Sequence, residues 1–527
     1  MNSDVSRRSF LGALAALGGL VGFDLSTAWA RPLLSARQSD KTLGRAIDLS
    51  IRSVARDGLN NFFPAPPEIT LLAEHADLRQ AVFEQAYMTL EAGEFRPQDF
   101  SKLDLIEFPK REYGARRTCA IMEPMDSVIY LALALLAAPA IERNRISAQE
   151  RVVHSFRYRP ALMAGKLFDG RFNYVSFLKE ARRRRGVTDV MASCDIAGFF
   201  DSVSPSCVGS ALAYADVPPD TAHLIVSLLE LWKPQGSKGL PVGPYASKIL
   251  AEAVLCKVDA SLRAEGVQFV RYVDDFRLIA PDRETAERQV HILDDVLAEG
   301  GFTLNAEKTE FTEPRGANDS LLRTAAYQQD APPRKFHKPT HQELRRLHKK
   351  SESLPDLDEL LTGALLPATK VRRTMRTAIC TGQSDYVGAI PVILDRYPEF
   401  SRYVTLALAY AADLIAEPTR RDLSSYAAAA ILDERTQRFA RMDFLRFVGE
   451  PGYVNRECLQ TYALASEPRG PEFRAALDAL RNSGGIPIQL LDRFEAADLS
   501  ARRGLALGLP DMRLLSATRD PFMNIMT

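Results

Sequence analysis

The stretch "RYVDDFRLI" (residues 271–279) places two adjacent aspartates, Asp274 and Asp275, inside a run that otherwise has the pattern of a buried strand. Aromatic and branched apolar residues on both sides favour strand, and an Asp-Asp pair between them suits a tight hairpin turn. Two carboxylates this close repel and raise each other's pKa unless a cation neutralises them. The pattern indicates either a carboxyl group that keeps its proton or, as the preferred interpretation, a metal site. An ordinary polar turn is the alternative.

A second Asp-Asp pair in the same chain serves as an internal control. In "HILDDVLAEG" (291–300), the apolar residues around Asp294 and Asp295 fall at helical spacing. This pair is therefore predicted to lie on the solvent-facing side of an amphipathic helix, where no chemistry is needed to explain it.

Length and composition bound the fold and the class of protein. The chain has 527 residues, 46% of them apolar and 25% charged, with a formal net charge of zero. It is too long for one core, which predicts two to four domains of a soluble globular protein. The six cysteines are scattered without metal-type spacing, so a disulfide framework or a zinc site is not expected.

Overall neutrality does not exclude a nucleic-acid partner, because phosphate binding depends on local clusters of Lys and Arg. Two such clusters are present, the unbroken run Arg182–Arg185 and the basic stretch 335–350. An ordinary solvated surface is the alternative for both.

The secondary-structure pattern indicates an α+β fold. Residues 43–180 are predicted to be mostly helical, with a hairpin at 108–124, and residues 187–315 alternate between strand and helix patterns. Residues 351–527 are rich in Leu, Ala and Arg at helical spacing, without a fixed repeat period.

A third aspartate occurs in "SCDIAGFFDSV" (193–203), where Asp195 ends an apolar strand. If this strand lies beside the hairpin in one antiparallel sheet, Asp195 converges with Asp274 and Asp275. Three such carboxylates suit two Mg²⁺ ions that activate a hydroxyl nucleophile and stabilise a leaving pyrophosphate.

These motifs resemble the palm of a reverse transcriptase. Asp195 matches the first block and "YVDD" (272–275) the catalytic hairpin, while "GLPVGPYASKILAE" (239–252) and "GFTLNAEKT" (301–309) match the segments between and after them, in the same order and spacing. The resemblance implies right-hand polymerase fingers and a palm with an antiparallel sheet, followed by an all-helical C-terminal domain.

The expected boundaries follow from this layout. They are a signal-like segment and linker (1–42), a mainly helical fingers-like region (43–186), the palm with the catalytic site (187–325), a basic thumb-like linker (326–350) and the helical C-terminal domain (351–527).

The resemblance also assigns roles to individual residues. It implies that Mg²⁺, or Mn²⁺, is held by the three catalytic aspartates and the carbonyl of Ile196. Nucleotide-binding residues are implied at Arg117 (in "RRTCAIMEPMD", 116–126), Phe200, Gly243 and Lys308, and nucleic-acid-binding residues at Arg116 and Tyr272. For Arg117 and Lys308, a surface role is the alternative. A ring at position 200 would collide with a 2′-hydroxyl, which favours deoxynucleotides.

One departure indicates a subclass. Where many members of the family have Pro-Gln-Gly, this chain has Pro241, Val242 and Gly243, which leaves template handling open. This segment is similar to abortive-infection and other phage-defence-associated bacterial reverse transcriptases, some of which make DNA without a template or prime from a protein hydroxyl. The alternatives are a retron- or intron-type reverse transcriptase and a catalytically silent nucleic-acid-binding scaffold.

The implied partners are deoxynucleoside triphosphates, RNA or DNA, a non-coding RNA and a second copy of the chain, without stable membrane association. The N-terminus points elsewhere, because "SRRSFLGALAALGGLVGFDLSTAWA" (6–30) resembles a twin-arginine export signal. An apolar helix packed on the protein, or a start codon assigned too early, explains it equally. We expect a cytoplasmic protein, since the substrates are found there, with export as the alternative.

Overall fold

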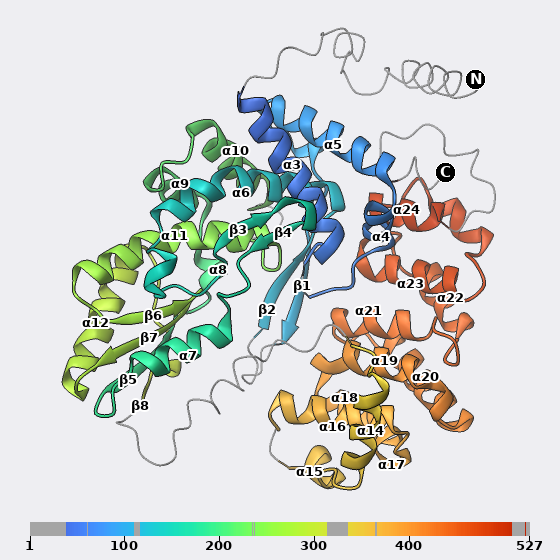
Figure 1. The fold of residues 1–527 in the computed structure, drawn as a ribbon. Coiled ribbons are helices and arrows are strands. Elements are labelled where there is room, and N and C mark those ends of the chain that lie inside the picture. The colour runs from blue at the N-terminus through green and yellow to red at the C-terminus, as the bar shows by residue number, and fades with distance from the viewer. Residues whose placement is uncertain are drawn as a thin grey trace, which may run out of the picture.

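The structure is a computed structural model that describes residues 38–60, 62–109, 116–233, 236, 238–312, 336–363, 366–507 and 522. One part of the chain combines helices with a four-stranded sheet, and the other is all-helical (Figure 1). The core of the predicted export signal, residues 6–30, lies outside the described residues.

The sheet has the strand order β6-β7-β5-β8, and every neighbouring pair is antiparallel. Its strands are β5 (Val190–Asp195), β6 (Phe269–Tyr272), β7 (Asp275–Ala280) and β8 (Glu310–Thr312). One face packs on α12 (Arg283–Glu299) and joins the main core, and the other face packs on α7 (Tyr174–Arg184). The predicted antiparallel sheet, with both aspartate motifs on adjacent strands, is therefore present.

The centre of this part is α6 (Pro124–Asn144), which contacts α3 (Gln38–Asp57), α10 (Pro219–Trp232) and α11 (Tyr245–Ala264). Among the described helices, α6 is the one long and apolar enough to cross a membrane, but 89% of its apolar window is buried inside the protein. Its composition is therefore that of a core helix. The remaining elements of this part are α4 (Pro67–Glu74), α5 (Ala76–Glu91), α8 (Phe199–Ser202), α9 (Pro205–Tyr214) and the hairpins β1 (Asp104–Pro109)–β2 (Arg116–Ile121) and β3 (Tyr158–Ala161)–β4 (Lys166–Phe168).

Residues 341–506 form the all-helical part, as the sequence pattern predicts. The helices are α14 (His341–Ser351), α15 (Leu357–Leu361), α16 (Ala368–Cys380), α17 (Ser384–Gly388), α18 (Ile390–Arg396), α19 (Ser401–Tyr410), α20 (Glu417–Leu432), α21 (Arg438–Phe447), α22 (Arg456–Ala465), α23 (Gly470–Asn482) and α24 (Leu499–Ala506). Helix α14 packs on α16, so the predicted boundary between residues 350 and 351 falls inside a helix that belongs with this part.

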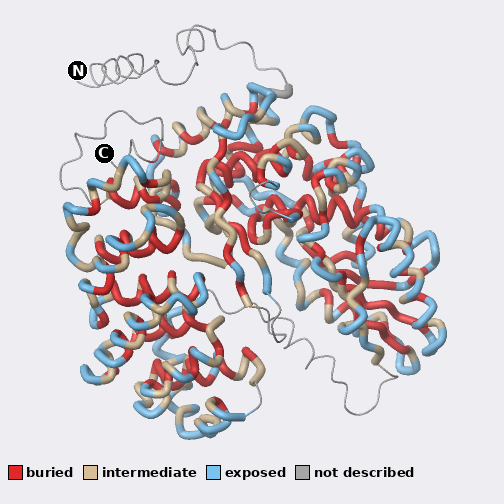
Figure 2. Tube along the Cα trace, turned by 180° about the vertical axis from the view of Figure 1, so that it is seen from behind, coloured by how far each residue is buried: buried red, intermediate tan, exposed pale blue. Residues whose placement is uncertain are grey.

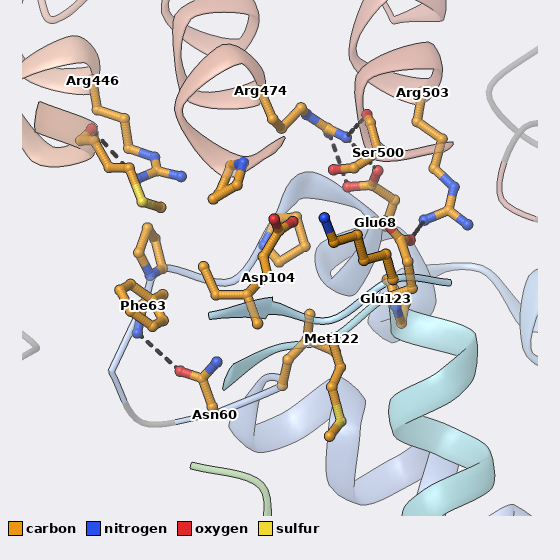
Figure 3. A pocket seen from close by; sticks show the side chains of 18 residues that line it. Asn60, Phe63, Glu68, Asp104, Met122, Glu123, Arg446, Arg474, Ser500 and Arg503 are labelled. Atoms are coloured by element: carbon orange, nitrogen blue, oxygen red, sulfur yellow. Dashed lines mark hydrogen bonds and ion pairs between the residues drawn. The ribbon is translucent and has the colours of Figure 1, made fainter. Parts of the chain in front are cut away.

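Each part has its own buried core (Figure 2). Ion pairs join the two parts. At the junction, Arg474 of α23 pairs with both carboxylate oxygens of Glu68, at 2.7 and 3.0 Å, and Arg503 of α24 pairs with Glu123. These residues line a cavity of about 60 Å³ (Figure 3). Because all four side chains are largely buried, breaking one pair would leave a buried charge uncompensated.

Candidate active site

Two aspartates lie opposite each other at the end of the central strands. Asp195 is the last residue of β5, and the register pairs it with Asp275, the first residue of β7. Side chains of directly opposite residues lie on the same face of an antiparallel pair, with Cβ atoms about 4.5–5.5 Å apart. The juxtaposition expected from the sequence is therefore found, while the catalytic role of these residues stays a prediction.

The turn between β6 and β7 is tight and strained. Tyr272 and Asp275 are register partners, so the chain reverses over Val273 and Asp274 alone. Val273 has a φ of 55°, in the left-handed region that a β-branched residue rarely adopts. Two-residue hairpins normally place Gly, Asn or Asp at such positions. Proteins retain strain of this kind mostly at functional sites, and here the strained turn presents Asp274.

The environment of the turn disfavours ionisation of Asp274 and Asp275. Burial, and then the charges of Asp195 and Asp275, raise the pKa of Asp274 well above its ordinary value. Burial also raises the pKa of Asp275, with a contribution from Asp195 that the charges of Arg277 and Lys308 oppose. Such a group either keeps a proton or takes up a cation.

Two of the predicted nucleotide-binding residues lie close to these carboxylates. The Nζ atom of Lys308 is 3.2 Å from Oδ2 of Asp195. Arg117 of β2 is exposed, and its charge acts to lower the pKa of Asp274. Both cations therefore bring positive charge to the aspartates, while their contacts with a nucleotide stay predictions.

A buried charge network, which sequence reasoning missed, supports the turn from behind. Arg271 is fully buried and donates to both carboxylate oxygens of Asp259 (2.7 and 2.5 Å), to Glu252 (3.1 Å) and to the carbonyl of Val273 (3.0 Å). Arg145 donates to the same carboxylate of Glu252 at 2.7 Å. The sequence does contain a signal for this network. Glu252 and Asp259 are seven residues apart on the apolar side of a predicted helix, where a buried charge needs a partner.

The loop before α11 rests on the residue predicted to lie under the nucleotide sugar. The N–H of Leu240 donates to the carbonyl of Phe200 at 2.9 Å. A Cβ atom on Gly239 would lie only 2.3 Å from that carbonyl oxygen, so position 239 has no room for a side chain. Phe200 itself is partly buried on α8.

The departure from Pro-Gln-Gly has a structural counterpart. The N–H of Ala120 donates to the carbonyl of Val242 at 3.0 Å, and the side chain of Val242 packs against the core of the C-terminal helices. Gly243 has a φ of 128°, and a Cβ atom there would lie 2.9 Å from Cβ of Asn60. This segment therefore joins the β1–β2 hairpin to α8, and Gly243 is needed for that geometry whether or not it contacts a nucleotide.

The two predicted nucleic-acid-binding residues lie in different settings. Arg116 is exposed and forms an ion pair with Glu107 across the β1–β2 hairpin, at 2.5 Å. Tyr272 is partly buried in an aromatic cluster, with ring centroids 5.3 Å from Tyr174 and 6.0 Å from Phe156. Their contacts with nucleic acid stay predictions.

The two basic clusters differ in availability. In the run Arg182–Arg185, Arg183 and Arg184 pair with Glu180, and Arg185 is buried against backbone carbonyls. Most of this run is thus engaged in contacts within the protein, which argues against a phosphate-binding role for it. Helix α14, by contrast, exposes its basic residues to solvent.

The described residues contain no preformed cage of three or more His, Cys, Asp or Glu side chains that would hold a metal on its own. Mg²⁺ commonly uses only one or two carboxylates, with water and substrate phosphates completing its shell. The backbone carbonyl of Ile196 fits this arrangement. Ile196 forms a β-bridge with Leu304, but the hydrogen bonds of this bridge are made by the residues on either side and not by the Ile196 carbonyl. The oxygen donors at Asp195, Asp274, Asp275 and Ile196 therefore suit an ion that arrives with a nucleotide.

Comparison with known proteins identifies the region that contains this site. Residues 142–344 match the family model described as "Reverse transcriptase (RNA-dependent DNA polymerase)". Residues 142–344 are therefore similar to a reverse transcriptase domain. The matched region includes all four strands of the sheet and the three aspartates.

Two further comparisons complete the findings. Among solved structures, apo telomerase from Candida tropicalis is similar over 69% of this chain and 66% of that chain, just under two thirds of its length, with 11% identity and a TM-score of 0.31. No curated protein matches the chain.

Proposed function

We propose that this chain is a DNA polymerase that adds deoxynucleotides by two-metal-ion nucleotidyl transfer. The observation that carries the proposal is the register pairing of Asp195 with Asp275, beside the strained turn that holds Asp274. Opposition of like charges at a strand end is costly unless the site binds cations or protons. The reverse transcriptase match over the same residues supports the choice of reaction.

The chain's own groups have distinct tasks in this mechanism. Asp195, Asp274, Asp275 and the carbonyl of Ile196 would hold Mg²⁺ or Mn²⁺, which when bound activates the attacking hydroxyl and neutralises the leaving pyrophosphate. Arg117 binds the triphosphate as a fixed cation. Lys308, already beside Asp195, neutralises charge that develops on the departing pyrophosphate.

We further propose a cytoplasmic role in anti-phage defence, with synthesis that is untemplated or primed from a protein hydroxyl. The similarity of residues 239–252 to the defence-associated enzymes supports this role, and so does the helical part that follows the sheet. RNA or DNA, a non-coding RNA and a second copy of the chain are its proposed partners.

The test uses purified full-length protein, labelled deoxynucleotides and Mg²⁺ or Mn²⁺. We expect incorporation by the wild type and none by Asp274→Asn. The matched control is Asp294→Asn, from the second Asp-Asp pair, which lies exposed on α12 and should remain fully active. Circular dichroism checks that both variants fold. Equal activity of Asp274→Asn and wild type would overturn the assignment, and an inactive wild type would favour the silent scaffold.

Sequencing the product distinguishes the modes of synthesis. A product that copies added RNA or DNA indicates a templated enzyme, whereas a sequence unrelated to any template supports untemplated synthesis. DNA that remains attached to the protein after denaturation, and is released by protease, would support protein priming.

A further inference from the structure

The hairpin that carries Arg117 is built into the core of a distant part of the chain. Ile106, Phe108 and Cys119 of the β1–β2 hairpin are at most 7% exposed and belong to the hydrophobic cluster of the C-terminal helices, not to the main core. Buried apolar area of this kind is the main attraction that holds two elements together. The apolar side of the hairpin is therefore fixed by residues that follow the reverse transcriptase domain.

A row of aromatic rings leads from this core to Arg117. Phe439 of α21 packs on Phe108 with ring centroids 4.4 Å apart. Phe108 is the register partner of Arg117, and its centroid lies 5.9 Å from that of Phe62. The guanidinium of Arg117 lies 5.8 Å from the centre of the same Phe62 ring, within the range of a cation–π contact. The rings that support Arg117 thus rest on Phe439.

A polar contact holds the same helix to the same strand. Arg438, next to Phe439, donates from Nη1 to the carbonyl of Leu105 in β1 at 3.3 Å. Its Nε and Nη2 atoms donate to the two carboxylate oxygens of Glu472, at 2.5 and 2.7 Å. A bidentate pair fixes the orientation of a guanidinium, so α21 holds the hairpin through two adjacent residues.

We infer that the C-terminal helices set the position of Arg117 relative to the aspartates, and that Phe439 is a positioning residue for nucleotide binding. The inference rests on the proposed function of Arg117 as the triphosphate ligand. Arg117 is exposed and lies on a two-stranded hairpin, and such a hairpin is marginally stable by itself. Without the ring of Phe439, the hairpin loses its support and Arg117 samples more orientations.

The experiment compares Phe439→Ala with Phe447→Ala. Both rings lie on α21 and are 2–3% exposed, but Phe447 packs on Tyr453 inside the helical part. Both substitutions leave a cavity in the same core, so they match for a purely structural effect. Steady-state incorporation gives KM and kcat, and equilibrium dialysis with labelled dATP and Mg²⁺ gives Kd without requiring turnover.

We expect Phe439→Ala to raise the KM and Kd for deoxynucleotide about two- to fivefold, with kcat little changed, because losing an interaction that is equally strong in the ground state and the transition state raises KM alone. Phe447→Ala should change neither constant. Phe439→Leu, which keeps most of the buried volume, should restore both. In an Arg117→Ala background, Phe439→Ala should add almost nothing, because the two substitutions act through one contact.

Equal constants for Phe439→Ala and Phe447→Ala, or independent effects of Phe439→Ala and Arg117→Ala, would overturn the inference while leaving the polymerase assignment intact. Failure of the polymerase assignment has a different signature, the absence of incorporation by the wild type. In that case the dialysis still decides whether Phe439 influences nucleotide binding.

Discussion

The buried network behind the turn at Val273 and Asp274 allows stability to be separated from the proposed activity. Arg271→Met removes the charge, keeps most of the side-chain volume, and removes the donor to the carbonyl of Val273. It also leaves the carboxylate of Asp259 without the bidentate partner that it has at 2.7 and 2.5 Å. Because both side chains are at most 1% exposed, solvent screening cannot compensate.

The expected loss of stability is large. Removing one partner of a buried ion pair costs about 3–5 kcal/mol, because the remaining charge stays desolvated. Replacing both partners by apolar residues is often neutral, so the double variant Arg271→Met/Asp259→Leu should recover most of the free energy of unfolding. It should not recover kcat, because the carbonyl of Val273 still lacks its donor and the turn that presents Asp274 is still unsupported.

Urea denaturation, followed by the fluorescence of the buried Trp232, measures stability, and deoxynucleotide incorporation measures kcat. The control is Glu287→Gln, which breaks the half-exposed pair with Arg283 on α12 and should cost no more than about 1 kcal/mol. If the double variant recovers both stability and kcat, Arg271 only balances charge and does not position the turn.

Three further predictions concern other parts of the molecule. Burial, and then the charge of Glu123, raise the pKa of Asp126 from 3.8 to about 8, so the folded state keeps a proton that the unfolded chain releases. The free energy of unfolding should therefore fall as pH rises between these values, by up to about 1.4 kcal/mol per unit, and urea melts of Asp126→Asn should lack this part of the decline. Arg346 on α14 and Arg373 on α16 are exposed, and the double variant Arg346→Glu/Arg373→Glu should weaken nucleic-acid binding. The magnitude of the slope of log K against log salt should fall by about 0.7–0.9 for each phosphate that the protein no longer neutralises. An unchanged slope would show that this surface does not bind nucleic acid. Phe200→Ala should lower the preference for deoxynucleotides over ribonucleotides, measured as the ratio of their kcat/KM values, and an unchanged ratio would remove Phe200 from the sugar site.

Local sequence pattern was sufficient to predict those features that depend on a single helix or strand. The two Asp-Asp pairs were distinguished by periodicity alone, and the structure places Asp294 and Asp295 exposed on α12 but Asp274 and Asp275 at a strand turn. The convergence of Asp195 with the hairpin aspartates was also predicted, because an antiparallel sheet brings the ends of the two motifs together. The structure makes Asp275, and not Asp274, the register partner of Asp195.

Contacts between segments that are distant in the sequence could not be predicted from local sequence pattern. The short β3–β4 hairpin lies in a region predicted to be helical, because a few residues of strand carry little periodicity. The run Arg182–Arg185 was considered a phosphate-binding cluster, but Glu180 lies one helical turn away and forms ion pairs with two of its arginines. Arg271 lies on β6 and its acidic partners lie on α11, and their burial depends on packing that composition does not reveal.

The location of the β1–β2 hairpin restricts how such a chain can be cut or recombined. A fragment that stopped after the sheet would expose Ile106, Phe108 and Cys119 to water, and an apolar patch of this kind promotes aggregation. C-terminal segments from related enzymes would not be interchangeable cassettes unless the matching face of the hairpin were transplanted with them. Substitutions on the two sides of this contact should therefore have accumulated together during evolution.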